Sequence, residues 1–380
     1  MNNKIARNSS FELLRIVAML MIVIHHISCH CVSVQLTDAE SIARMGNGFF
    51  SNPIIYKKLW LIDFGYMFGP IGNAIFILIS GYFMVAKENI NLSKAGQKLL
   101  TQLGFAAFIL MMGSFVLYRS MGISEGLVGV SRFNTMSWYV GYYFSVIVIA
   151  KLFLNRLLQG FDKKQYIEFM LVIFAVVEFE WTGALLDGLV PDLRMLFTGL
   201  FLYSFGGYIR KYNPFKNLRI SAIIVFFIAM IFCICISSYN ERSANIASFI
   251  KSGSESYKQA LVSFSNFNVL VLFTAIMLFE LFRRINIGNS KVVNYIGGTT
   301  FMVYLIHDNE LFYKFWGRCD WIKLLHDNPM LYVVNILKWG VMTFMVGVLA
   351  YVVYRLICYA ATLCSRLFFR REIKHADSNI

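Results

Sequence analysis

The chain has 380 residues, of which 58% are hydrophobic, 16% aromatic and only 15% charged, whereas roughly 25% of the residues in a soluble domain are charged. A soluble domain of this size could not hide 36 Phe residues and still cover itself with polar surface. The composition therefore excludes a soluble enzyme. It also excludes disordered, collagen-like and disulfide-framework proteins, because the chain is neither polar, periodic in glycine nor rich in cysteine.

The formal net charge is +14, which by itself would fit a nucleic-acid-binding protein. The Lys and Arg residues, however, fall between apolar blocks and do not form one basic segment. Positive charge confined to short loops is what orients a multi-pass membrane protein. We therefore attribute the charge to membrane topology and expect no nucleic-acid partner.

Apolar runs of about 20 residues, the length that crosses a bilayer as a helix, predict an all-α, polytopic membrane protein with about ten transmembrane helices. The fifth and sixth predicted spans are short, and the loop GALLDGLVPDL separates them. The ten predicted spans are 11-30, 62-86, 99-118, 135-154, 166-182, 194-209, 220-238, 261-282, 295-313 and 331-357.

With the N-terminus inside, the outer segments hold about half as many Lys and Arg residues as the inner ones. This bias predicts that both termini are cytoplasmic and that the protein is a multi-pass protein of the cell (inner) membrane. We expect one transmembrane domain over 1-365 and a short basic cytoplasmic tail over 366-380. Glu12 and Arg15 interrupt the first apolar run, which indicates a retained span and not a cleaved signal peptide. Ser9 and Glu12 have the spacing of a helix-capping box.

The first span carries the most informative ionisable residues, because such side chains are costly inside a membrane and are functional candidates by default. Arg15 and His26 are 11 residues apart, which places them within about 20° of the same helix face and ~16 Å apart along the axis. His25 falls about 80° away from that face. We therefore select His26, and not His25, as the histidine that shares a cavity with Arg15.

Three stretches carry a family resemblance: FELLRIVAMLMIVIHH in the first span, GPIGNAIFILISGYFMV in the second and NYIGGTTFMVYLIHDNELF in the ninth. Together they resemble the acyltransferase 3 family of integral-membrane O-acyltransferases. Weaker similarities occur at SWYVGYYFSVIVIAKLFLN and LFLYSFGGYIRKY. The resemblance covers nearly the whole chain, with the stretches in the order that the family has. No single stretch is specific, but the ordered set is.

The resemblance implies transfer of an acyl group, usually acetyl from cytoplasmic acetyl-CoA, to a hydroxyl of a cell-surface polysaccharide or lipid-linked sugar. Acetyl-CoA is then a co-substrate, and no bound cofactor is expected. His26 would be the general base or would carry the acyl group transiently, and the residues alone do not separate these mechanisms. Arg15 would bind the donor phosphates. Membrane lipid and other proteins of surface-polysaccharide assembly complete the expected partners.

Where the family often has an Arg-x-x-Arg pair, this chain has Lys94 and Lys98. These lysines could bind donor phosphate as point charges, without the two-pronged geometry of Arg. Four further residues could line the site: Ser80 and Gly81 in the second span, and Tyr304 and His307 in the ninth. For Ser80 and Gly81, close helix packing explains the residues equally well.

Purely structural roles for the charged residues also stay open. Arg15 could extend to lipid headgroups with help from Glu12, and His26 could be a buried histidine bonded to a neighbouring helix. His307 and Asp308 could simply form a polar helix end, because adjacent helical residues point about 100° apart.

A metal site is a further possibility in the first span. His26, Cys29 and His30 have a helical spacing that could hold zinc. No carboxylate ligand is identifiable, however, and none of the seven Cys residues forms a C-x-x-C pair. We therefore expect no metal.

Two other functions fit a polytopic chain with buried charges. A secondary transporter of a small anionic or sugar substrate is one, although such proteins often show two similar halves, which this sequence lacks. A lipid-sugar glycosyltransferase is the other, and it would depend on acidic residues such as Asp38 and Glu40 in the first outer loop.

Overall fold

The computed structural model describes residues 8–35, 53–87, 90–121, 138–252, 264–266 and 268–377. Every regular element within these ranges is a helix, which confirms the all-α fold class. The first half contains α1 (Ser9–Ile27), the π-helical turn η1 (Ser28–Val32), α2 (Ser33–Gln35), α4 (Pro53–Met84), α5 (Leu92–Met121), α7 (Trp138–Ile149), the π-helical turn η2 (Ala150–Leu154), α8 (Asn155–Gly160) and α9 (Lys163–Glu178).

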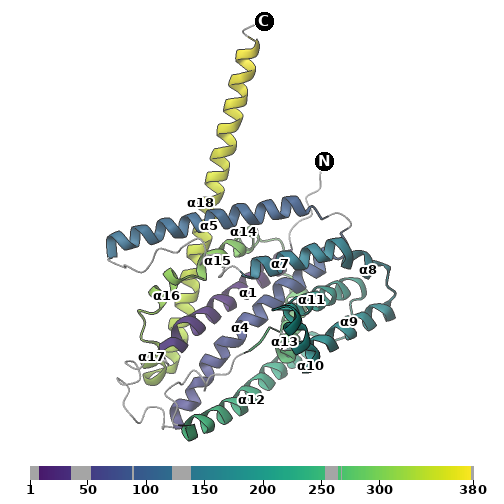
Figure 1. Cartoon of the computed structure of the whole chain (residues 1–380), viewed down its shortest axis with the longest axis vertical. Coiled ribbons are helices and arrows are strands. Elements are labelled where there is room, and N and C mark those ends of the chain that lie inside the picture. The colour runs from purple at the N-terminus through teal and green to yellow at the C-terminus, as the bar shows by residue number, and fades with distance from the viewer. Residues whose placement is uncertain are drawn as a thin grey trace.

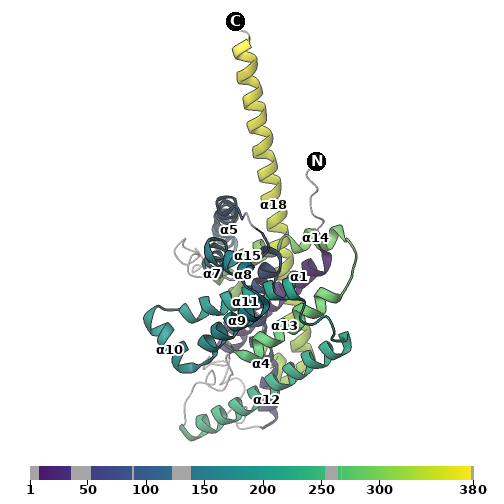
Figure 2. The ribbon, with the colours of Figure 1, turned by 90° about the vertical axis from the view of Figure 1, so that its right-hand side faces the viewer.

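The second half begins with a short helix and ends with a very long one. It contains α10 (Glu180–Leu189), α11 (Leu193–Tyr212), α12 (Ile220–Ser252), α13 (Val269–Arg284), α14 (Lys291–Gly297), α15 (Thr300–His307), α16 (Glu310–Trp316), α17 (Trp321–Asp327) and α18 (Pro329–Asp377). Figures 1 and 2 show α18 extending well beyond the other helices. The predicted tail therefore continues the last helix through Asp377.

Six helical segments in the described ranges are long and apolar enough to cross a membrane. A seventh candidate is the pair formed by α9 and the end of α10, which bends by 77°. The protein is therefore a multi-pass membrane protein, but the count of ten spans stays a prediction. The six segments are Ser9–Gln35, Lys58–Met84, Leu92–Leu117, Trp138–Gly160, Ile220–Ala244 and Pro329–Ser365.

The remaining predicted spans are helical but interrupted or short. The helix predicted within 261-282 is α13, whose 16 residues extend about 24 Å, less than the roughly 30 Å of a hydrocarbon core. The single helix predicted over 295-313 was wrong, because this stretch holds the end of α14, all of α15 and the start of α16. The chain leaves the helical path at Asp308 and Asn309, whose backbones are not helical.

The N-cap of α1 lies one residue before the predicted cap, Ser9. Asn8 is the N-cap residue, and its side chain accepts a hydrogen bond from the Ser10 backbone N–H. The capping box with Ser9 as the cap was therefore wrong. Ser9 Oγ instead donates to Asn294 Oδ1 at 2.9 Å and accepts from the Ser290 backbone N–H at 2.9 Å. These contacts tie the start of α1 to α14.

α1 and α4 run side by side through the middle of the bundle (Figure 1). About 56% of the apolar segment of α1 and 72% of that of α4 are buried, against 22% for α5 and 11% for α12. α1 begins beside α14 and continues through η1 to α16 and α17, where α18 starts. The start of α1 and the end of α18 thus lie toward the same end of the bundle (Figures 1 and 2). Which side of the membrane this end faces stays a prediction.

Candidate active site

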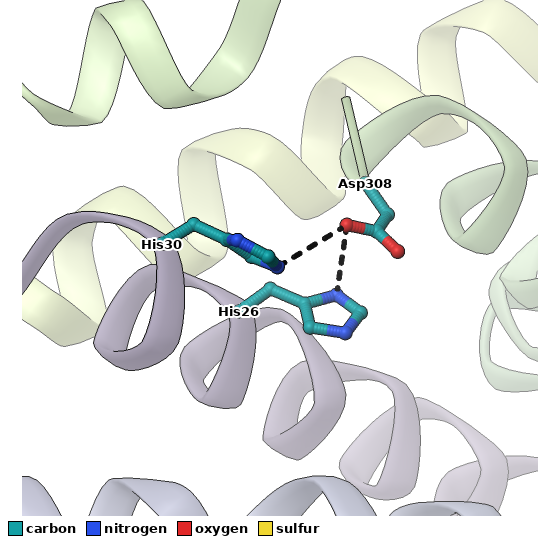
Figure 3. A group of neighbouring side chains, drawn as sticks. All are labelled: His26, His30 and Asp308. Atoms are coloured by element: carbon teal, nitrogen blue, oxygen red, sulfur yellow. Dashed lines mark ion pairs between the residues drawn. The ribbon is translucent and has the colours of Figure 1, made fainter. Parts of the chain in front are cut away.

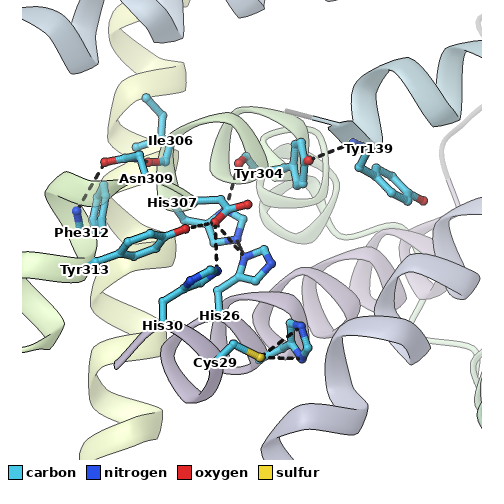
Figure 4. A network of polar contacts seen from close by, with 12 residues as sticks. His26, Cys29, His30, Tyr139, Tyr304, Ile306, His307, Asn309, Phe312 and Tyr313 are labelled. Atoms are coloured by element: carbon cyan, nitrogen blue, oxygen red, sulfur yellow. Dashed lines mark hydrogen bonds and ion pairs between the residues drawn. The ribbon is translucent and has the colours of Figure 1, made fainter. Parts of the chain in front are cut away.

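His26 of α1 contacts His307, the last residue of α15 (Figure 4). His26 Nδ1 lies 2.7 Å from His307 Nε2, and the two rings are nearly parallel with centroids 4.9 Å apart. His307 is completely buried, and 14% of the His26 side chain is exposed. The structure therefore joins two predicted site residues that are 281 positions apart in the chain.

The partners of His307 determine where the protons lie. His307 Nδ1 is 3.0 Å from the Val303 carbonyl oxygen and 2.9 Å from the Tyr304 carbonyl oxygen. Because a carbonyl can only accept, Nδ1 of His307 carries a proton, and Nε2 of the neutral ring is an acceptor. We infer that His26 Nδ1 donates to this acceptor. The neutral His26 ring then has an unprotonated Nε2.

Asp308 lies at the centre of a cluster with His26, His30 and Tyr313. Its Oδ1 lies 3.6 Å from His26 Nδ1 and 3.8 Å from His30 Nε2, and it accepts a hydrogen bond from the Tyr313 hydroxyl. The carboxylate reaches α1 because α15 ends before it and Asn309 starts a new helix. Asn309 caps α16 by accepting from the N–H groups of Leu311 and Phe312.

The expectation of one regular helix through Asp308 was wrong, because α15 ends at His307. A continuous helix would point Asp308 about 100° away from His307. A sequence signal for the break existed: Asn309 followed by Glu310 is typical of a helix start. Helical periodicity by itself does not take this capping signal into account.

His25 makes a different set of contacts. Its Nδ1 lies 2.7 Å from the Tyr66 carbonyl oxygen of α4. A side chain on Gly69 of α4 would collide with the His25 ring, its Cβ lying 2.5 Å from two ring carbons. Cys29 Sγ is 3.5 Å from His25 Nε2. His25 therefore packs against α4.

Arg15 lies one turn from Glu12 and pairs with it, with Arg15 Nη1 2.6 Å from Glu12 Oε1. About 30% of the Arg15 side chain is exposed, whereas Glu12 is buried beside Gly297 of α14. This contact uses one of the five N–H donors of the guanidinium. The donor-binding role of Arg15 stays a prediction.

Lys94 and Lys98 are exposed near the start of α5. The same part of α5, with Phe144 of α7, lines an open depression of about 700 Å³. None of the residues lining it belongs to the histidine cluster. A role of these lysines in binding the donor also stays a prediction.

Ser80 and Gly81 take part in contacts between helices. Ser80 Oγ donates to the Phe76 carbonyl at 2.8 Å and lies 3.0 Å from the Tyr143 hydroxyl of α7. A Cβ on Gly81 would overlap the backbone carbonyl of Tyr203 in α11. For Gly81, this close approach of two backbones favours the packing interpretation that the sequence left open.

Tyr304 lies beside His307 within the buried region. Its ring is 5.8 Å from the His307 ring and 5.7 Å from the Tyr139 ring, and its hydroxyl accepts the Tyr139 backbone N–H at 3.3 Å. Tyr304 thus connects the start of α7 to the helix that carries His307 (Figure 4). The site-lining role of Tyr304 stays a prediction.

The acyltransferase 3 family model, which describes an acyltransferase domain, matches residues 8–355. The chain belongs to this family. The match covers nearly the whole chain and includes the histidine cluster, so this protein is a membrane acyltransferase. No curated protein and no solved structure matches the chain significantly.

Family membership favours an acyltransferase over the transporter and the glycosyltransferase considered from the sequence. Asp38 and Glu40, on which the glycosyltransferase interpretation depended, lie outside the described residues. The match also confirms the family resemblance that the sequence showed.

Proposed function

We propose that this acyltransferase moves an acetyl group from cytoplasmic acetyl-CoA to a hydroxyl of a cell-surface polysaccharide or lipid-linked sugar. It acts in the inner membrane with both termini in the cytoplasm. Acetyl-CoA is a co-substrate that leaves as CoA after each turnover. Family membership supports the acyl transfer, and the loop charges support the orientation.

The observation that carries the proposal is the hydrogen bond between His26 Nδ1 and His307 Nε2. His307 is held in one tautomer by two backbone carbonyls, so His26 Nδ1 must supply the proton of that bond. This arrangement leaves the Nε2 lone pair of His26 available for a substrate hydroxyl. A base whose other ring nitrogen is oriented by a fixed partner is the arrangement that acyl transfer to an alcohol requires.

In the proposed reaction, the acceptor hydroxyl gives its proton to His26 Nε2 while its oxygen attacks the thioester carbonyl carbon. The tetrahedral intermediate then collapses, the carbon–sulfur bond breaks, and the CoA sulfur takes the proton from His26. Asp308, with Oδ1 3.6 Å from His26 Nδ1, stabilises the imidazolium that exists between the two proton transfers. The bond formed is the new ester, and the ring returns to its starting state.

The alternative, in which His26 carries the acyl group, uses the same nitrogen. Nε2 would attack the thioester itself, and the acceptor hydroxyl would then attack the acyl-imidazole. Rapid acid quenching after mixing with [¹⁴C]acetyl-CoA separates the two mechanisms. Label on the protein that depends on His26 supports the relay, and label on the glycan alone supports direct transfer.

Arg15 supplies the donor contact in this proposal. It lies ~16 Å from His26 along the helix axis, so an extended pantetheine arm could run between a phosphate at Arg15 and a thioester at His26. Arg15→Ala should weaken acetyl-CoA binding to the purified protein, as measured by isothermal titration calorimetry. Unchanged affinity would reject the donor role.

The deciding experiment uses the native acceptor, whatever its structure. Proton NMR of surface glycans is compared among a producing strain, a deletion strain and strains restored with native protein, His26→Ala or His326→Ala. We expect the O-acetyl signal to be lost on deletion and restored by native protein and by His326→Ala, but not by His26→Ala. His326 is an exposed histidine on α17 and controls for loss of an imidazole elsewhere. Full acetylation by a well-expressed His26→Ala variant would refute the catalytic assignment.

A further inference from the structure

We propose that His26, His30 and Asp308 form a binding site for a divalent transition-metal ion, with Zn²⁺ the best match, and that the bound ion blocks acyl transfer. The binding half of this inference stands on the geometry of the cluster alone. The blocking half rests on the proposed function, because it depends on His26 acting through its Nε2 nitrogen.

The three ligand atoms are already close to the separations of a zinc site (Figure 3). His26 Nδ1 and His30 Nε2 lie 3.6 and 3.8 Å from Asp308 Oδ1, and all three side chains offer atoms within 4.8 Å of one another. Tetrahedral ligands with bonds of 2.0–2.2 Å to zinc are about 3.4 Å apart. Side-chain movements of a few tenths of an ångström at Asp308, and somewhat more between the histidines, would complete the site.

The backbone arrangement suits this geometry. His26 and His30 are four residues apart on one face of the helical stretch formed by α1 and η1, the spacing with which helices present two imidazoles to one zinc ion. The missing carboxylate, whose absence argued against a metal from the sequence, is supplied by Asp308 from the break after α15. The separated position of the third ligand is why the sequence did not reveal it.

Tyr313 of α16 orients two of the three ligands. Its hydroxyl donates to Asp308 Oδ1, and its ring stacks on His30 with centroids 4.2 Å apart and planes tilted by 14°. Outer groups that orient metal ligands in this way are usual in metal sites and raise affinity. Two imidazoles and one carboxylate favour zinc over calcium or magnesium, which prefer all-oxygen sites.

An ion can reach the cluster from the side of His30. About 41% of the His30 side chain is exposed, against 14% for His26 and 9% for Asp308. Three protein ligands leave the fourth position of a tetrahedral ion to water. The site is therefore accessible at its His30 edge and closed on the side of His307.

Metal binding at His26 Nδ1 is incompatible with its role as a base. In the active arrangement Nδ1 carries the proton and Nε2 has the lone pair. When Nδ1 binds the ion through its lone pair, the neutral ring must carry its proton on Nε2, and the hydrogen bond to His307 is lost. Nε2 then has no lone pair to take the proton of the substrate hydroxyl, although the charge of the ring is unchanged.

The binding half is tested by isothermal titration of ZnCl₂ into the purified full-length protein in detergent, in chelator-free buffer. We expect one specific Zn²⁺ per chain, and at least about tenfold weaker binding in His30→Gln. His326→Gln is the matched control, because His326 also has a carboxylate neighbour, Asp327 Oδ1 at 2.7 Å from its Nδ1, but no third ligand in the described chain. Equal zinc binding by native protein and His30→Gln would overturn the proposal.

The blocking half is tested with membranes from the producing strain, which contain the native acceptor. Incorporation of [¹⁴C]acetyl into glycan should fall when Zn²⁺ is added and recover with EDTA. Measured against the rate of the same variant without zinc, His30→Gln should lose the zinc sensitivity, whereas His326→Gln should stay sensitive. Specific zinc binding without inhibition, or activation by zinc, would overturn the blocking role.

The two proposals fail in different measurements. If the proposed acetyl transfer is wrong, the deletion and His26→Ala glycans show it without any metal. If only the metal proposal is wrong, those glycans change as expected, and the zinc titration of His30→Gln matches that of native protein.

Discussion

α1 and α12 are both apolar enough to cross a membrane, yet they occupy opposite environments. The apolar segment of α12 has the higher mean hydropathy, 2.9 against 1.9, and only 11% of it is buried, against 56% for α1. α12 exposes Phe226, Ile228 and Phe232, whereas α1 buries Leu14, Ile22 and Val23. The more hydrophobic helix is thus the outer one, because its side chains must satisfy lipid and not neighbouring helices.

The comparison shows where chemistry is placed in this protein. α1 can carry Glu12 and Arg15 because they pair with each other, and it can carry His26 because α15 supplies His307 as a partner. α12 packs against α13 and α4, and a buried ion pair joins its Arg242 to Asp63 of α4. Hydropathy therefore identifies the lipid-facing helices best, and it underestimates the central ones.

The largest effect that this comparison predicts is on catalysis. His307→Phe removes the acceptor that orients His26 while keeping an aromatic ring of similar shape. Acetyl incorporation into glycan should fall by about 10²–10⁴-fold, the usual contribution of a positioned base. Retention of the native thermal midpoint would show that the loss is not unfolding. Nearly full activity would mean that His307 does not set the His26 tautomer.

The second effect concerns the ion pair that anchors α12. Asp63→Asn leaves the buried Arg242 guanidinium without its counter-charge, so we expect a loss of about 3–5 kcal/mol of stability. Thermal unfolding in detergent measures it. The double variant Asp63→Leu with Arg242→Met should recover much of the loss, because it buries no charge. Equal destabilisation of both variants would contradict the electrostatic explanation.

The third effect tests packing between central helices. Gly81→Leu inserts a side chain where α4 meets the Tyr203 backbone of α11. We expect a loss of about 1–3 kcal/mol, typical of overpacking, again from thermal unfolding. Gly104→Leu on α5 is the control, because a Cβ there would meet no atom within 4 Å. If both variants unfold at the same temperature, the close approach of α4 and α11 does not limit stability.

The smallest effect is expected on the lipid-facing surface. Phe232 of α12 is 64% exposed, so Phe232→Ala should change stability by less than about 0.5 kcal/mol. Acetyl incorporation should stay at the native level. A large loss of stability or of acetyl incorporation would indicate that this face of α12 contacts protein. The proposed difference between α12 and α1 would then be wrong.

Much of the protein could be predicted from local sequence patterns. Composition predicted a membrane protein, and apolar runs located many of its helices. That Arg15 and His26 share one helix face stays a prediction. The ordered similarity to a family predicted acyl transfer, and the family match confirmed it. Six segments within the described ranges are long and apolar enough to cross a membrane, and the count of ten spans stays a prediction.

The sequence by itself determined the membrane class, the helical fold and the family, since each depends on composition or on local patterns along the chain. Only the tertiary structure decided the partners of His26. Helical periodicity specifies a direction but not the helix that occupies it, and His307 and Asp308 lie some 280 residues farther along the chain. The Asn309 cap ends the helical path after His307 and brings the Asp308 carboxylate to α1, which a regular helix would not do.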